Sequence, residues 1–198
     1  VVPLVFAIYP QIPAKTLPEF VAWMKANPDK AKVATSGRGS AQEMAAEMFR
    51  MAAGVDMLLV PYKGSSAAHP DLLAGRTALY IDTVSAIQAQ VKAGNARAIA
   101  VSTIRRTPAL PDVPTADEQG LKGYDANTNG GFLAPAGTPK AIIAKLNAEI
   151  NAALKLPDVR AKLEAAGVDI QGGTPQDYSA LIRSDLAKWG KVIKEAGI

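Results

Sequence analysis

The sequence predicts an α/β fold built on an open, mainly parallel sheet with helices on both faces. Short apolar segments alternate with helical segments from Val2 to Ser102, and the links between them are short. Alternation of this kind is typical of a three-layer α/β unit. The composition agrees with this prediction, because 48% hydrophobic and 20% charged residues in a chain of 198 indicate a globular protein.

Strands are expected over residues 2–8, 32–35, 57–62, 78–81 and 96–102. Helices are expected from the Thr16 cap to about residue 27, and over 41–53, 66–74 and 84–92. Thr16 is a favourable N-cap with Pro18 in the first turn behind it. Gly54 is placed to end the second helix, because glycine adopts the left-handed conformation that often follows a helix.

The pattern changes after Ser102. Three prolines between 105 and 115 predict an irregular surface segment, followed by a short helix over 115–119. The glycine-containing segment 125–135 is expected to cross between two lobes. The rest is expected to be helical, over 139–154, 157–166 and 174–196, because each of these segments begins with a proline start signal.

Small polar residues gather where three of the strands lead into helices. These residues are Ser36, Gly37, Gly39 and Ser40 in the first junction, Lys63, Gly64 and Ser65 in the second, and Asp82 and Thr83 in the third. Ligands of open α/β sheets bind beyond the carboxyl ends of the strands, where helix N-termini direct free N–H groups at an anion. The junctions are therefore expected to converge on one anion-binding crevice.

Two residues of these junctions have alternative interpretations. Lys63 supplies positive charge to the anion or is a solvated lysine at a strand end. Asp82 caps the helix at Val84, accepts a hydrogen bond from a ligand, or does both.

Several classes of protein and site are excluded or disfavoured. Cysteine is absent, so disulfides, thiolate metal sites and a cysteine nucleophile are excluded. His69 is the single histidine and is expected to be a surface or helix-packing residue, which makes a transition-metal site improbable. The Gly37–Gly39 pair lacks the third glycine of a dinucleotide fingerprint, and neither a P-loop nor a nucleophile elbow is present.

Nucleic-acid and membrane partners are disfavoured as well. The net charge is +4, yet the 22 basic residues are scattered among 18 acidic ones, and Arg105-Arg106 is the only adjacent basic pair. A nucleic-acid site needs a clustered basic surface, so none is expected. The apolar runs are too short to embed the chain in a membrane.

The chain resembles the Bug (TctC-type) solute-binding proteins of tripartite tricarboxylate transporters. Two runs carry much of the resemblance, Ser36-Gly37-Arg38-Gly39-Ser40 and Val60-Pro61-Tyr62-Lys63-Gly64-Ser65. Further matching segments lie at 12–17, 25–28, 54–56, 71–75, 82–83, 106–115, 133–139 and 189–191. Together they cover almost the whole chain in the order of the family.

The resemblance implies a periplasmic-binding-protein-like (type II) architecture, in which two lobes close on a carboxylated solute without catalysis and without a cofactor. Residues 1–126 are then the second lobe with a crossover strand, and residues 127–198 are the return segment and C-terminal helices of the first lobe. The N-terminal part of the first lobe is expected to be absent, which agrees with a start inside the strand-like run at Val1. The implied partners are a small carboxylate and membrane transporter subunits or a sensor protein, and the implied location is the periplasm.

By position, the polar residues of the first two junctions match the family's anion-holding loop and its neighbour, and Asp82 and Thr83 match a polar strand end that faces the cleft. Glu43 departs from the pattern, since many members have histidine or another polar residue there. A carboxylate in the first turn of a helix uses the helix dipole itself, which disfavours a dianionic ligand. An α/β enzyme acting on an acidic or phosphorylated small molecule, with Asp82 as acid or base, is the alternative. An interaction module that presents the solute to a membrane partner is a third hypothesis.

Overall fold

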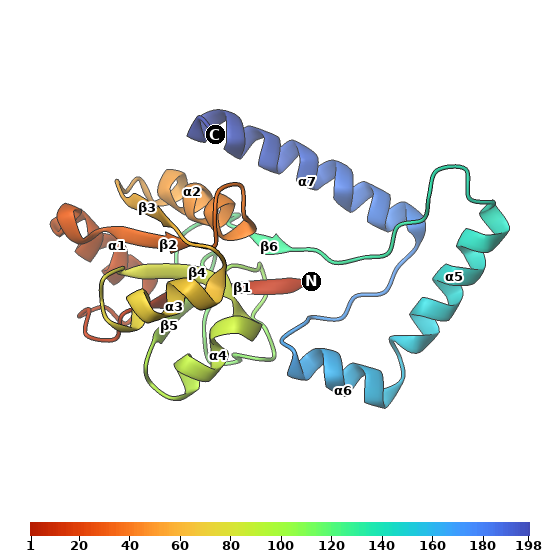
Figure 1. The fold of residues 1–198 in the computed structure, drawn as a ribbon, viewed down its shortest axis with the longest axis horizontal. Helices are drawn as coiled ribbons and strands as arrows, with labels where there is room; N and C mark the ends of the chain where they lie inside the picture. The colour runs from red at the N-terminus through yellow and green to blue at the C-terminus, as the bar shows by residue number, and fades with distance from the viewer.

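The computed structural model describes residues 1–198 as an α/β body with an open helical arm (Figure 1). One sheet runs through the body in the order β3-β2-β4-β1-β5, and β6 also pairs with β1. The strands are β1 (Val2–Ile8), β2 (Lys32–Thr35), β3 (Leu58–Pro61), β4 (Leu79–Thr83), β5 (Arg97–Val101) and β6 (Asn127–Thr128). The expected open α/β sheet is confirmed, and each strand expected before residue 103 lies within two residues of its expected bounds.

The sheet is mixed rather than uniformly parallel. β2 pairs in parallel with β3 and with β4, whereas β1 is antiparallel to β4, β5 and β6. β4 and β5 therefore point the same way, with β1 reversed between them. The sequence did not reveal this reversal, because β1 is buried on both faces and a continuous apolar run is compatible with either direction.

Four helices cover the two faces of the sheet, as Figure 1 shows. They are α1 (Leu17–Ala26), α2 (Ala41–Ala53), α3 (Ser65–Leu73) and α4 (Val84–Lys92). Phe6 of β1 packs with Phe20 and Phe49 from α1 and α2, whereas its neighbour Val5 packs with Ala68 and other residues of α3 and α4. Alternate residues of β1 thus enter opposite cores, as the two-residue period of a strand requires.

The expected caps are present. Thr16 and Glu19 form a capping box at the start of α1, and Gly54 ends α2 with φ +58. The short helix expected over 115–119 is wrong, because this segment is a turn. Thr115 and Glu118 exchange the hydrogen bonds of a capping box there, but the backbone reverses at Gly120, with φ +103, before a helix develops.

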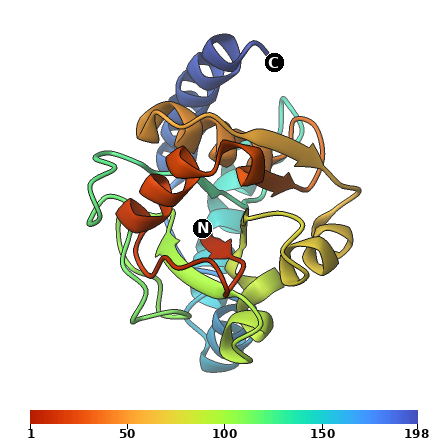
Figure 2. The same ribbon diagram turned by 90° about the vertical axis from the view of Figure 1, so that its left-hand side faces the viewer.

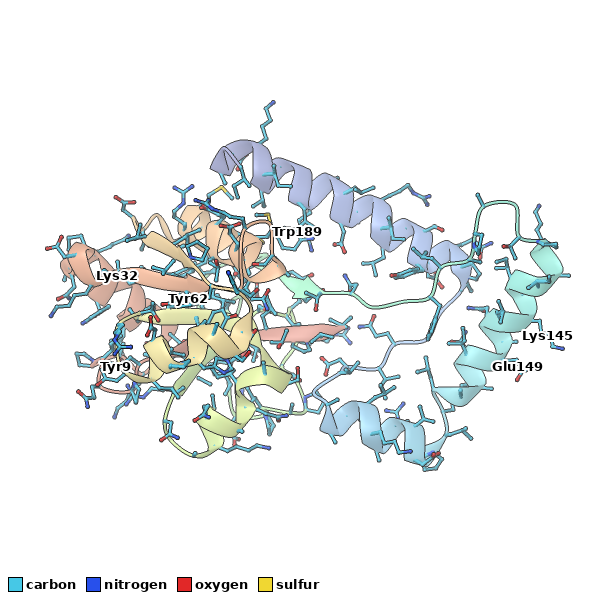
Figure 3. The ribbon with its side chains drawn as sticks, in the orientation of Figure 1. Tyr9, Lys32, Tyr62, Lys145, Glu149 and Trp189 are labelled. Carbon is cyan, nitrogen blue, oxygen red and sulfur yellow. The ribbon has the colours of Figure 1, made fainter.

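The arm contains α5 (Lys140–Ala153), α6 (Pro157–Ala165) and α7 (Pro175–Ala196). Figure 1 shows α5 and α6 standing away from the body, whereas Figure 2 views the body with these helices behind it, and neither helix buries a residue. α7 returns to pack against α2, with Val192 buried and Trp189 against the core (Figure 3). No helix is long and apolar enough to cross a bilayer.

Large apolar side chains remain exposed along this arm. They are Phe132, Leu133, Ile142, Leu146, Leu156, Ile182, Leu186, Ile193 and Ile198. Their number contrasts with the body, where most large apolar side chains lie in the two cores. The arm therefore presents apolar surface that the described residues do not cover.

Candidate functional site

The three polar junctions meet at one edge of the sheet. β3, β2 and β4 are neighbours that run in parallel, so the junctions that follow them lie side by side. Gly64 N donates to Ser36 O at 3.2 Å and joins the first two junctions. Ser65 Oγ donates to Asp82 Oδ1 at 2.8 Å and joins the second to the third. Polar side chains from positions far apart in the sequence thus form one cluster.

Asp82 is the centre of this cluster. Its side chain is 0% exposed. Oδ1 accepts hydrogen bonds from Ser65 Oγ (2.8 Å), Gln42 Nε2 (3.2 Å) and Thr83 N (2.8 Å), and Oδ2 lies 2.8 Å from His69 Nε2. A buried carboxylate with this many donors is fully satisfied. Asp82 therefore connects the three junctions through hydrogen bonds in the interior of the protein.

The expected capping role of Asp82 is wrong, because Thr83 is the N-cap of α4 and no side chain caps that helix. The expected role as a ligand acceptor stays a prediction. Both oxygens of Asp82 contact groups of the chain in this structure, so the carboxylate supports the junctions from the interior.

His69 is not the surface or simple packing residue that the sequence suggested. Its side chain is only 16% exposed, and Nε2 contacts Asp82. Its ring lies edge-on to the ring of Tyr80, with the two ring centroids 5.9 Å apart. The signal in the sequence was the four-residue spacing from Ser65, which places both side chains on one face of α3. Their common partner, Asp82, lies on another element, so the spacing alone did not reveal the contact.

Tyr80 lies beneath the same cluster. Its hydroxyl donates to Ser65 Oγ at 3.0 Å. Burial, together with the negative charge of Asp82, raises the pKa of Tyr80 to about 12, so the phenol stays protonated at neutral pH. Ser65 uses its own hydroxyl hydrogen on Asp82 rather than on His69. The Ser65 hydroxyl is therefore not activated as a nucleophile by a histidine base.

The first junction is already occupied by a carboxylate of the chain. Gly39 N donates to Glu43 Oε2 at 2.6 Å, and Glu43 N donates to Ser40 Oγ at 3.1 Å. Gly37 has φ +126, and a Cβ on it would lie 3.3 Å from Tyr62 O, so glycine suits this position. The loop has the expected shape, but Glu43 uses the Gly39 N–H that was expected to face an anion.

The second and third junctions have less internal capping. Gly64 is the N-cap of α3 and Thr83 is the N-cap of α4, and neither helix has a side-chain cap. Lys63 is exposed beside Gly64 and makes no ion pair. No side chain accepts from the backbone N–H groups at the starts of α3 and α4. At the start of α2, by contrast, Ser40 and Glu43 accept from such groups.

Other parts of the surface differ in character from this edge. A hollow of about 560 Å³ is lined by Pro10, Lys15, Arg97 and neighbouring residues. It lies at the opposite edge of the sheet, since the end of β1 at Ile8 pairs with Leu79 at the start of β4. No group of three or more His, Asp or Glu side chains is placed to hold a metal ion.

Comparison with known proteins assigns the chain to a family. The family described as the tripartite tricarboxylate transporter family receptor, TctC, matches residues 1–198. The chain belongs to the TctC family. The resemblance seen in the sequence is thereby confirmed.

Individual TctC relatives are similar over most of the chain. A UPF0065 protein in the tcbD-tcbE intergenic region of Pseudomonas sp. strain P51 is 40% identical over 170 residues, which cover 85% of this chain and 51% of that protein. The structure of R. palustris Rpa4515 with adipate matches with a TM-score of 0.87 and 34% identity, over 100% of this chain and 66% of that one. The periplasmic binding protein BugD matches with a TM-score of 0.82 and 32% identity, over 100% and 67%. The chain thus spans about half the length of the curated relative.

Proposed function

We propose that this chain is part of a periplasmic solute-binding protein that captures a small carboxylated metabolite in a cleft between two lobes. The observation that carries the proposal is the meeting of three strand-to-helix junctions at one sheet edge, in a chain of the TctC family. The similarity to Rpa4515, whose structure contains adipate, supports a carboxylate as the ligand. The similarity to BugD supports the periplasmic location.

The binding surface in this proposal consists of the exposed parts of the three junctions. The starts of α3 and α4 offer backbone N–H groups without side-chain caps, and Lys63 adds a positive charge at their rim. Hydrogen bonds from such groups to a carboxylate contribute roughly 1.5–3 kcal/mol each. One or two of these bonds give only weak affinity, so tight binding requires contacts from a second lobe as well.

The arrangement of the chain supports two lobes with the proposed bounds. Residues 1–126 form the second lobe with its crossover strand, and residues 127–198 belong to the first lobe. β1 and β6 run side by side where the two parts join, with Val2 opposite Thr128. Phe132 and Leu133 beyond this junction are 81% and 78% exposed. The proposal assigns such apolar side chains of the arm to the interior of the first lobe.

The proposed partners follow from the family. A receptor of a tripartite transporter delivers its solute to membrane subunits, or presents it to a sensor protein. The enzyme alternative has less support, because the buried Asp82 has both oxygens occupied and is poorly placed to exchange protons with a substrate.

Isothermal titration calorimetry with adipate tests this proposal. A two-lobed protein that contains residues 1–198 is expected to bind with micromolar affinity, and residues 1–198 alone much more weakly. Lys63→Ala is expected to weaken binding, whereas Lys122→Ala is the matched control, because Lys122 pairs with Asp117 away from the junctions. Micromolar binding by residues 1–198 alone would contradict the requirement for two lobes. Failure of the two-lobed protein to bind adipate or any other small carboxylate would contradict the proposed function.

A further inference from the structure

We propose that Glu43 is a specificity-determining residue that closes the first junction to anions. Its carboxylate fills the position at the start of α2 that an anionic group of a solute would otherwise take. The inference rests on the proposed function and deepens it. The end of the solute that faces α2 is neutral or bears hydrogen-bond donors, as a hydroxyl, amide or ammonium group does, and a second carboxylate is rejected there.

The hydrogen bonds at the start of α2 are the first support. Glu43 Oε2 accepts from Gly39 N at 2.6 Å, a short contact of the kind that charged acceptors make. Ser40 Oγ accepts from Glu43 N, so the N-cap site is filled as well. The carboxylate also compensates the positive end of the α2 dipole. The groups at the start of α2 that would attract an anion are therefore already paired with side chains of the protein.

Burial is the second and independent support. The Glu43 side chain is 1% exposed, and its other oxygen, Oε1, is buried without a hydrogen-bond partner. Thr35 Oγ1, at the end of β2, is also buried without a partner. Two of the three such oxygens in the molecule therefore lie in this junction, beside the loop of residues 36–40. The unpartnered carboxylate oxygen of Glu43 attracts a donor and repels a second negative charge, whereas the neutral Thr35 hydroxyl can either donate or accept.

The nearest cation does not cancel the repulsion between Glu43 and a second negative charge. Arg38 Nη1 lies 3.6 Å from Glu43 Oε1, but the Arg38 side chain is 79% exposed. An exposed guanidinium is screened by solvent, so its compensation of a buried carboxylate is small. Asp82, which Gln42 links to α2, adds a second buried carboxylate at the same edge.

The test follows the Gly39 amide by NMR while acetate is added to the full chain. Three proteins are compared: the unaltered chain, Glu43→Gln and Glu19→Gln. Glu19 is a matched control, because its Oε2 accepts from Lys15 N with the same four-residue spacing, but at an exposed helix start away from the junctions. Acetate probes the anion position directly and does not require closure of two lobes.

In the unaltered chain, the Gly39 amide is expected not to respond to acetate. In Glu43→Gln, the Gly39 amide is expected to titrate, with an apparent affinity at least about tenfold above the upper limit set by the silent unaltered chain. This difference is equivalent to ~1.4 kcal/mol and lies within the range for an anion at a helix N-terminus. In Glu19→Gln, the Gly39 amide is expected to stay silent. The Lys15 amide, which then faces an uncharged acceptor, is expected to respond more weakly than the Gly39 amide of Glu43→Gln.

Three results would overturn the inference. They are a Gly39 amide that titrates in the unaltered chain, a Gly39 amide that stays silent in a folded Glu43→Gln variant, and equal responses of Lys15 and Gly39 in their respective variants. The measurement on the unaltered chain decides the first point even if the Glu43→Gln variant fails to fold. Failure of adipate calorimetry with the two-lobed protein would refute the proposed function and leave the acetate result standing.

Discussion

Replacing Asp82 tests whether the buried network organises the three junctions. Alanine at this position removes the acceptor of four groups: Gln42 Nε2, Ser65 Oγ, Thr83 N and His69 Nε2. A buried donor left without its acceptor costs about 1–3 kcal/mol, because it loses its partner without regaining water, and Asp82→Ala leaves several such donors. Asp82→Ala is therefore expected to lower the free energy of unfolding by about 3–5 kcal/mol, a large part of the stability of a typical domain.

Asp82→Asn separates charge from shape. Asparagine keeps an oxygen that can accept from Ser65 and Thr83, but it places an NH₂ group opposite His69 Nε2 and removes the negative charge. The expected loss is about 1.5–3 kcal/mol, the value of a hydrogen bond to a charged group. The side chains stay close in size, so a cavity does not contribute.

Urea denaturation followed by circular dichroism measures both variants, and His69→Ala completes a double-mutant cycle with Asp82→Asn. The Asp82–His69 pair is expected to show a coupling energy of about 1 kcal/mol or more. An Asp82→Ala variant within 1 kcal/mol of the unaltered chain, or a coupling energy near zero, would refute the reasoning that this carboxylate holds the edge of the sheet together.

Two further predictions concern parts of the chain outside the polar junctions. Gly75→Ala is expected to destabilise the chain by about 2–4 kcal/mol, because Gly75 has φ +72 and its added Cβ would lie 2.7 Å from Tyr9 Cε1. Gly94→Ala has a similar φ with nothing within 4 Å, so its cost in calorimetric unfolding is about 1–2 kcal/mol, and equal costs for the two variants would contradict the contact. Hydrogen bonds hold the pKa of several carboxyl groups below the usual values, namely Glu19, Asp71, Asp117, Glu118 and Asp177. Since these pKa values are lower in the folded chain than in the unfolded chain, the stabilisation is complete above roughly pH 4.5 and is lost as the pH falls through the folded values; a urea midpoint that stays constant between pH 5 and pH 3 would disprove this.

Much of the fold could be predicted from local patterns. The Thr16 cap, the Gly54 stop and the alternation of apolar segments place the helices and strands of the body within a residue or two. These features depend on neighbours in the chain, so a single sequence contains the necessary information. The neighbouring positions of the three polar junctions followed from the same reasoning, because parallel strands bring their carboxyl ends to one edge.

Two other features could not be predicted. The direction of β1 and the partner of His69 each depend on which groups meet in space. The competition of Glu43 for the start of α2 was predicted, because Glu43 lies only four residues from Gly39. His69 and Asp82 are 13 residues apart, and Gln42 and Asp82 are 40 apart. Periodicity places a side chain on a face of its own element, but it does not say which of several donors on other elements reaches a given carboxylate.

Local chemistry along the chain was thus sufficient for the elements, their caps and the edge where polar residues gather. The allocation of hydrogen bonds at that edge was settled only by folding, because each carboxylate accepts from the donors that packing brings within about 3 Å. That allocation leaves Asp82 internally saturated and the start of α2 filled by Glu43, whereas the starts of α3 and α4 remain without side-chain caps.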